Sequence, residues 1–151
     1  ICSTFDSSPR IGSIGRAIDI GQRLFASPFV PVIVGAPILR RYVVFGNLFA
    51  FFGGANHRID RHPTMSRHPI TPMDEADLRL HLGKQTDKRI GLVDWLALGG
   101  APADVDARLA AVRASHEIVL FDTIDDARLA EVGRLVWTAA SAASVSSDRP
   151  L

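Results

Sequence analysis

Short apolar runs alternate with longer segments of helical periodicity in the second half of the chain, and this alternation restricts the fold more than any other feature. The runs at residues 90–93 and 118–121 are strand-like, and each is followed by apolar residues at three- and four-residue spacing. One helix is predicted from Pro102 or Ala103, and another from residues 122–126. Such an order favours parallel pairing through right-handed crossovers. We predict an α/β fold, a three-layer sandwich with a mostly parallel sheet.

The first half of the chain predicts further elements of the same sheet. Residues 1–5 are interpreted as the end of a buried strand, residues 6–9 as a turn and residues 30–34 as a short apolar strand. Between them lies a helix with one apolar face, formed by Ile11, Ile14, Ala17, Ile18, Gly21, Leu24 and Phe25. Gly12 and Gly15 would let an anion approach the backbone N–H groups at its start, although caps and packing explain such glycines equally well.

A β-hairpin insertion or a bent strand pair is predicted at residues 41–52, where two strand-like runs flank Gly46-Asn47. Its four phenylalanines are expected in the core or at a domain contact; they are Phe45, Phe49, Phe51 and Phe52. An amphipathic helix is predicted at residues 74–85, with Leu78 and Leu82 facing inward and a capping-box-like start at Thr71 and Asp74.

Composition is that of one ordinary globular domain, residues 1–151. With 17 Lys and Arg against 16 Asp and Glu, the net charge of +1 does not favour nucleic acid or a membrane surface as partner. The single Cys2 excludes an internal disulfide and fits a reducing, cytoplasmic setting. No apolar run reaches membrane-spanning length. Because the chain opens at Ile1 as though cut within a strand, we expect a fragment of a larger soluble protein.

Residues 58–73 form a polar, proline-rich segment that we predict to be a rigid loop. It contains three Arg, two His and three Pro, and each proline fixes φ and removes a backbone donor. The loop would present basic side chains in restricted positions, which suits an anionic ligand. In parallel sheets ligands bind at the carboxyl ends of strands, where Asp6, Asp94 and Asp122 follow predicted strands.

Three catalytic alternatives have less support from the residues. A metal site would use His57, Asp60, His62 and His68, but no pair has the helical i, i+4 spacing of a zincin, so we predict no metal ligands. A serine nucleophile at Ser3, Ser7 or Ser8 would lack the usual G-x-S-x-G elbow. Cys2 lies in an apolar strand and is interpreted as a core thiol. Recognition of a small hydroxylated acid remains.

Three stretches resemble the amino-terminal domain of the four-carbon acid sugar kinases, which include 3-oxo-tetronate, threonate and erythronate kinases. The stretches are residues 2–15, residues 41–50 and residues 61–75. The resemblance is dense as far as Glu75 and only topological after about Gly91. The family's usual Asp-Asp-Phe/Leu-Thr-Gly motif has no match in this sequence, and neither does its nucleotide-binding half.

The resemblance implies half of a kinase active site. The full-length protein would transfer the γ-phosphoryl group of ATP, with Mg²⁺, to the terminal hydroxyl of a four-carbon sugar acid, and its own carboxyl-terminal domain would supply most of the nucleotide site. This chain alone should be inactive. Asp6 or His68 would orient or deprotonate the attacking hydroxyl. The substrate-binding residues implied are Ser3, Thr4, Ser7, Gly12, Arg61, His62, Met65 and Thr71.

A second hypothesis is a non-catalytic module that binds a sugar acid and regulates another protein. A nucleotide domain downstream would favour the kinase, whereas a DNA-binding or transmembrane segment would favour the sensor. Association into a homo-oligomer is compatible with either hypothesis.

Overall fold

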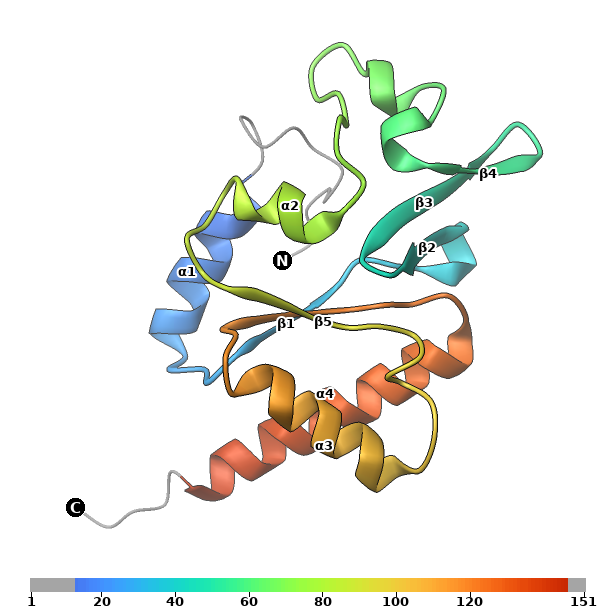
Figure 1. Ribbon diagram of the computed structural model, residues 1–151. Helices are drawn as coiled ribbons and strands as arrows, with labels where there is room; N and C mark the ends of the chain where they lie inside the picture. The colour runs from blue at the N-terminus through green and yellow to red at the C-terminus, as the bar shows by residue number, and fades with distance from the viewer. Residues whose placement is uncertain (1–12, 147–151) are drawn as a thin grey trace.

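The computed structural model describes residues 13–146, with side chains described as far as Ser141, and places them in two small sheets and four α-helices (Figure 1). The elements in chain order are α1 (Ile14–Leu24), β1 (Val30–Ile33), η1 (Pro37–Leu39), β2 (Arg41–Val44), β3 (Asn47–Phe52), β4 (Ala55–Arg58), η2 (Ile59–Arg61), η3 (Met65–Arg67), α2 (Leu78–Gly83), β5 (Ile90–Val93), α3 (Pro102–Arg113), β6 (Ile118–Phe121) and α4 (Asp126–Ser146), where η marks a 3-10 helix.

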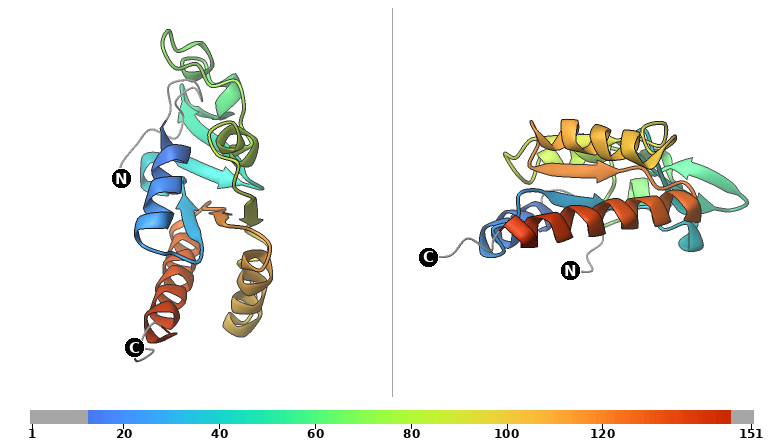
Figure 2. Two further views of the ribbon diagram at one scale, coloured as in Figure 1. Left: turned by 90° about the vertical axis from the view of Figure 1, so that its left-hand side faces the viewer. Right: turned by 90° about the horizontal axis from the view of Figure 1, so that it is seen from below.

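Sheet A, formed by β1, β6 and β5 in that order, is entirely parallel. Its central strand β6 is buried along its whole length, and alternate side chains point to opposite faces. Val119 and Phe121 pack with residues of α3 and α4, and both helices lie beneath the sheet in Figures 1 and 2. Ile118 and Leu120 pack on the other side with α1, α2 and the second sheet. This arrangement confirms the predicted three-layer α/β fold.

Sheet B, formed by β2, β3 and β4, is antiparallel and confirms the hairpin insertion. The turn between β2 and β3 consists of Phe45 and Gly46, one residue earlier than predicted, because Asn47 pairs with Val44. Both turn residues have positive φ, 49° and 78°, the signature of a type I′ hairpin turn. A bridge between Val43 and Thr123 joins sheet B to the end of β6.

Several predicted details of the hairpin and helices differ in the structure. The polar strand β4 was not predicted. Helix α2 begins at Leu78 with Asp77 as its N-cap, not at Asp74. Of the apolar face assigned to α1, Ile14 and Ile18 pack against the core, but Leu24 is 75% and Phe25 is 82% exposed. These two residues lie at the C-terminal end of α1, where Leu24 is the last helical residue and Phe25 is the C-cap.

Phe49 is half-buried, and the other three hairpin phenylalanines lie outside the core; their contact with another domain stays a prediction. Phe45, Phe51 and Phe52 are each more than a third exposed, because Leu48 and Ala50 supply the buried face of β3. The predicted strand at residues 1–5 lies outside the described residues. No helix within residues 13–146 is long and apolar enough to span a bilayer.

Candidate functional site

The segment from Ile59 to Met73 forms a compact loop that projects beyond sheet B, at the top of Figure 1. Ile59 and Met73 anchor its two ends, since both side chains are essentially fully buried in the core around sheet B. Met65, halfway along, packs against the same core. The Met73 backbone N–H also donates to the Met65 carbonyl oxygen at 2.9 Å. The predicted loop therefore contains two short 3-10 helices, η2 and η3, and packs against the core through Ile59, Met65 and Met73.

The loop contains two Arg-His-Pro sequences, at residues 61–63 and 67–69. In the first, the imidazole Nδ1 of His62 accepts from the backbone N–H groups of Thr64, at 3.3 Å, and Met65, at 3.2 Å. The hydroxyl of Thr64 lies 3.1 Å from the same nitrogen. His62 is only 5% exposed and its ring lies against those of Phe52 and His57. This histidine holds the first turn from within the structure.

The second Arg-His-Pro turn repeats this hydrogen bonding. Nδ1 of His68 accepts from the backbone N–H groups of Thr71, at 3.0 Å, and Ile70, at 3.4 Å, and lies 2.9 Å from the hydroxyl of Thr71. Here the imidazole is half-buried. The repeat is visible in the sequence as two identical tripeptides six residues apart, a signal that the sequence interpretation missed.

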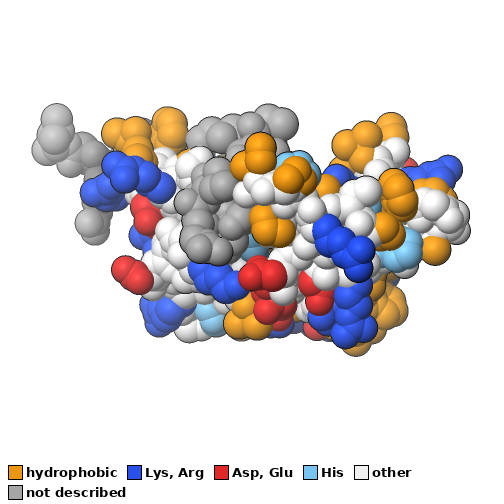
Figure 3. Space-filling model, turned by 90° about the horizontal axis from the view of Figure 1, so that it is seen from above, with side chains coloured by type: hydrophobic (Ala, Val, Ile, Leu, Met, Phe, Trp, Pro, Cys, Tyr) orange, Lys and Arg blue, Asp and Glu red, His pale blue; other side chains and the backbone are white. Residues whose placement is uncertain are grey.

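The guanidinium groups of the loop fall into two classes. Arg58 forms a two-point ion pair with Asp60, and this hydrogen bonding holds the pKa of the Asp60 carboxyl below its usual value. Arg61 and Arg67 are exposed and form no ion pair among the described residues. Figure 3 shows Lys or Arg and His side chains among hydrophobic ones on the right-hand side, over sheet B and the loop. Arg61 and Arg67 are thus available to an anion.

The carboxyl edge of sheet A contains Asp122, which is fully buried and accepts three backbone hydrogen bonds. Its donors are the N–H groups of Phe45 at 2.6 Å, Gly46 at 2.9 Å and Trp95 at 3.1 Å. Burial raises the pKa of Asp122, and these hydrogen bonds oppose the shift. Asp94 accepts from the Ala97 N–H at 2.8 Å. Asp94 and Asp122 therefore accept backbone hydrogen bonds, and Asp122 supports the strained Phe45 turn; Asp6, the third carboxylate predicted at this edge, lies outside the described residues.

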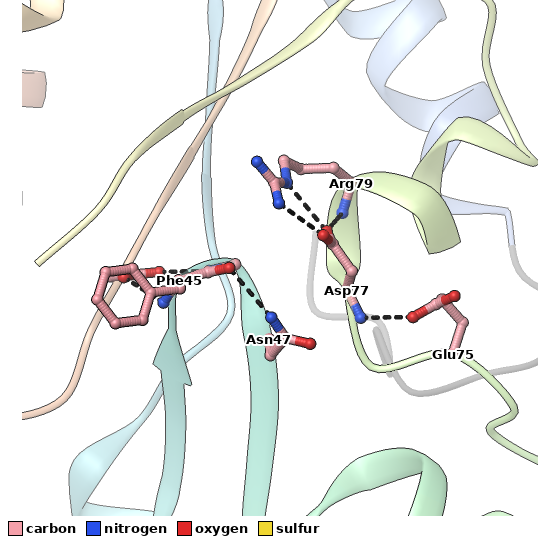
Figure 4. Close-up of polar contacts among 7 residues, drawn as sticks. Phe45, Asn47, Glu75, Asp77 and Arg79 are labelled. Atoms are coloured by element: carbon pink, nitrogen blue, oxygen red, sulfur yellow. Dashed lines mark hydrogen bonds and ion pairs between the residues drawn. The ribbon is translucent and has the colours of Figure 1, made fainter.

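Asp77 and Arg79 form a partly buried ion pair at the start of α2 (Figure 4). The Arg79 guanidinium contacts both carboxylate oxygens of Asp77, at 3.0 and 2.6 Å, and the Asp77 N–H donates to Glu75 at 2.8 Å. The pKa of Asp77 is lowered: burial raises it, but the hydrogen bonds from Arg79 outweigh burial. This cluster connects α2 to the Phe45 turn, because the Leu78 N–H donates to the Gly46 carbonyl oxygen at 2.9 Å.

The start of α1 is in contact with protein. The Gly15 N–H donates to Oε1 of Gln85 at 3.1 Å, and a Cβ on Gly15 would lie 2.5 Å from the Gln85 backbone oxygen. Gly15 therefore serves helix packing and not ligand approach. The site residues predicted before it lie outside the described residues: Ser3, Thr4, Asp6, Ser7 and Gly12. Of the predicted set, the structure places Arg61, His62, Met65, His68 and Thr71 in one loop.

The residues considered for a metal site have other interactions. Asp60 pairs with Arg58, and Nε2 of His57 lies 3.2 Å from the Phe52 carbonyl oxygen. The Nδ1 atoms of His62 and His68 accept backbone hydrogen bonds. Within residues 13–146 there is no group of three or more His, Cys, Asp or Glu side chains able to hold a metal ion.

Comparison with known proteins places this loop within a recognised domain. The family model described as "Sugar-binding N-terminal domain" matches residues 1–148. The chain is 59% identical over 138 residues to a protein of Paraburkholderia graminis named 3-oxo-isoapionate kinase, and 33% identical to one of Methylobacterium radiotolerans named 3-oxo-tetronate kinase. These matches cover 91% and 90% of the chain but 29% and 31% of those relatives. The resemblance to the sugar acid kinases is confirmed.

Solved structures give the same result for the fold. A protein of Salmonella typhimurium LT2 superposes with a TM-score of 0.78 at 26% identity, covering 89% of this chain and 31% of that one. A Haemophilus influenzae protein superposes with a TM-score of 0.75 at 27% identity, covering 90% of this chain and 32% of that one. The chain thus corresponds to somewhat less than a third of the proteins that it resembles.

Proposed function

The chain belongs to the family of sugar-binding N-terminal domains, and we propose that it is the substrate-binding domain of an ATP-dependent kinase that phosphorylates a small sugar acid. The observation that carries this proposal is the Arg-His-Pro loop. It presents two exposed guanidinium groups and a half-buried imidazole on a segment anchored by Ile59 and Met73. A preorganised basic loop of this kind binds a carboxylate and its neighbouring hydroxyls at low entropic cost.

The proposed roles of the residues come from the family resemblance, and in phosphoryl transfer the protein acts mainly by positioning and electrostatics. Arg61 would bind the substrate carboxylate, and His62, Met65 and Thr71 would line the same wall. Ser3, Thr4, Ser7 and the amides near Gly12 would form the opposite wall. Asp6 or His68 would orient or deprotonate the attacking hydroxyl. The oxygen of that hydroxyl would then form a bond to the γ-phosphorus of ATP, while the bond between this phosphorus and ADP breaks.

The substrate class is a sugar acid with an oxo group at carbon 3. Both named relatives are kinases of 3-oxo acids, and the relative with 59% identity is named for 3-oxo-isoapionate, whereas the one with 33% is named for 3-oxo-tetronate. We therefore rank 3-oxo-isoapionate above the four-carbon acids predicted from the sequence, namely 3-oxo-tetronate, threonate and erythronate.

ATP and Mg²⁺ would be held mainly by a carboxyl-terminal domain of the full-length protein. Mg²⁺ would neutralise charge on the transferring phosphoryl group. We further propose that the protein is cytoplasmic and that its substrate is a small molecule. Light scattering would show whether it forms a homo-oligomer.

A phosphorylation assay tests this proposal directly. The gene product that carries this chain is incubated with ATP, Mg²⁺ and each of the four acids, and ADP release is measured. We expect turnover with at least one 3-oxo acid. Binding of an acid without ADP release would instead identify a non-catalytic sugar-acid sensor, the competing hypothesis.

Arg61→Ala tests the assignment of the carboxylate. Loss of a charge-assisted hydrogen bond should weaken acid binding by about 1.5 to 3 kcal/mol, measured by calorimetry. Arg89→Ala is the matched control, because Arg89 is an exposed arginine paired with Glu117 beside the amino end of β5. Equal affinities for wild type and Arg61→Ala would refute the role of Arg61.

A further inference from the structure

We infer that His68 serves as a hydrogen-bond donor to the sugar acid through Nε2–H, and that Thr71 is the positioning residue that holds its imidazole in this state. This inference rests on the proposed function and decides between the two roles open to His68. His68 then orients an oxygen of the substrate and is not the general base.

Two backbone N–H groups donate to Nδ1 of His68. A backbone N–H can only donate, so the nitrogen that accepts from Thr71 at 3.0 Å and Ile70 at 3.4 Å carries no proton. A neutral imidazole must then carry its proton on Nε2. The Thr71 hydroxyl, 2.9 Å from Nδ1, is a third donor to the same lone pair. The turn therefore selects one tautomer of His68.

The first Arg-His-Pro turn is an independent instance of the same device. Its Nδ1 faces the N–H groups of Thr64 and Met65 and the hydroxyl of Thr64. The two histidines differ in their surroundings: His62 is buried against aromatic rings, whereas His68 is half-buried and no described residue hydrogen-bonds its Nε2. In the second turn, Nε2–H of His68 has no hydrogen-bond acceptor among the described residues.

The tautomer has a consequence for catalysis. A general base needs a free lone pair, but the Nε2 lone pair is replaced by a proton and the Nδ1 lone pair is occupied by donors. Transfer of a second proton to Nδ1 would set it against two backbone N–H groups. Nε2–H can instead donate to a carboxylate, hydroxyl or carbonyl oxygen of the acid. The proton of the attacking hydroxyl would then pass to another group, for which Asp6 is the predicted candidate.

Two substitutions of His68 separate the roles kinetically in the full-length gene product. The amide nitrogen of glutamine can take the place of Nε2–H but cannot accept a proton near neutral pH. We expect His68→Ala to lower kcat/KM by about 10- to 100-fold, the loss of one good hydrogen bond, and His68→Gln to restore most of it. Equally slow turnover by both variants would overturn the inference in favour of a base.

A direct readout of the tautomer needs no substrate and no activity. Long-range ¹H–¹⁵N spectra of the histidine-labelled protein distinguish Nδ1–H from Nε2–H by the ¹⁵N shifts. We expect Nε2–H for His68, and a Nδ1–H pattern would overturn the inference. This measurement is informative even if no acid is phosphorylated, in which case the proposed function fails while the tautomer is still established.

Thr71 is tested with the same spectra. Thr71→Val removes the hydroxyl donor at constant shape but keeps both backbone donors, so we expect the Nε2–H tautomer to persist with shifted and broadened His68 ring signals and a lower kcat/KM. Thr71→Ser should restore the wild-type signals and kcat/KM. Thr64→Val is the matched control, since it makes the same change in the buried turn and should leave the His68 signals unmoved. Unchanged His68 signals in Thr71→Val would refute the positioning role of Thr71.

Discussion

Sheet A and the Arg-His-Pro loop are held together by different forces. All four side chains of β6 are at most 1% exposed, and both faces of sheet A are covered by apolar layers. In the loop the apolar side chains that pack in the core are Ile59, Met65 and Met73, and the loop's shape depends on imidazole nitrogens that accept backbone N–H bonds. Apolar burial therefore sets the stability of the domain, while local polar contacts set the shape of the candidate site.

Phe121→Ala should break this comparison on the side of sheet A. Removal of a fully buried phenylalanine leaves a cavity between β6 and the helices below it, and we expect a loss of about 3 to 5 kcal/mol in the free energy of unfolding. Urea unfolding followed by circular dichroism measures it. Phe51→Ala is the matched control, because Phe51 is 36% exposed on sheet B. Similar losses in both variants would contradict the description of the core.

Asp122→Ala tests the junction between sheet A and sheet B. It leaves the N–H groups of Phe45, Gly46 and Trp95 without their acceptor at a buried position. We expect a loss on the order of 3 kcal/mol in unfolding free energy, since each unsatisfied buried donor costs about 1 to 3 kcal/mol. The exposed Asp87→Ala should change stability by less than about 0.5 kcal/mol. A wild-type unfolding curve for Asp122→Ala would show that the turn needs no buried acceptor.

His62→Ala sharpens the comparison within the loop. The variant removes the acceptor for two backbone N–H groups and a ring packed against Phe52, so we expect a loss of about 1 to 3 kcal/mol. Amide hydrogen exchange should also become faster at Thr64 and Met65. Slow exchange at both amides in the variant would show that His62 does not hold this turn.

His68→Ala makes the same change in the exposed turn and should cost less. The freed N–H groups can bond to water here, so we expect a loss below about 1 kcal/mol in unfolding free energy, together with the weaker turnover described above. The measurement compares the loss of unfolding free energy in His68→Ala with that in His62→Ala. If His68→Ala destabilises the protein as much as His62→Ala, the two turns are equally structural.

Acid unfolding should show the smallest effect, and its sign distinguishes the two regions. The pKa of Asp60 is lowered by Arg58, so its ion pair stabilises the folded protein above the ordinary pKa near 3.8, and this stability is lost as pH falls through the folded value. The pKa of Asp122 is raised by burial, so its ionisation costs stability as pH rises from 3.8 through the folded value.

Urea midpoints measured from about one unit below the ordinary carboxyl pKa to about two units above it test these signs. Asp60→Asn should remove part of the acid-side loss of stability. Asp122→Asn should remove part of the opposite trend above pH 3.8. Parallel pH profiles for wild type and both variants would contradict the assigned shifts.

Local sequence patterns were sufficient for most of the layered fold. β5, β6 and the start of α3 at Pro102 lie where predicted, because apolar periodicity and a proline at the first helical turn are local signals. The proline-rich loop was likewise recognised from residues that cannot continue a helix or a central strand. The candidate residues Arg61 and His68 could be named for the same reason.

Contacts between distant segments decided the rest. The turn between β2 and β3 lies one residue earlier than predicted because Asp122 accepts the N–H groups of Phe45 and Gly46. Asp122 is 77 residues away from Phe45 in the sequence. α2 began at Leu78 because residues 76–78 hydrogen-bond to β3 and its turn, which keeps the preceding segment extended. Sequence alone placed the apolar and rigid segments, since their causes are local, but the direction of each buried donor and acceptor depends on partners that only the tertiary structure brings together.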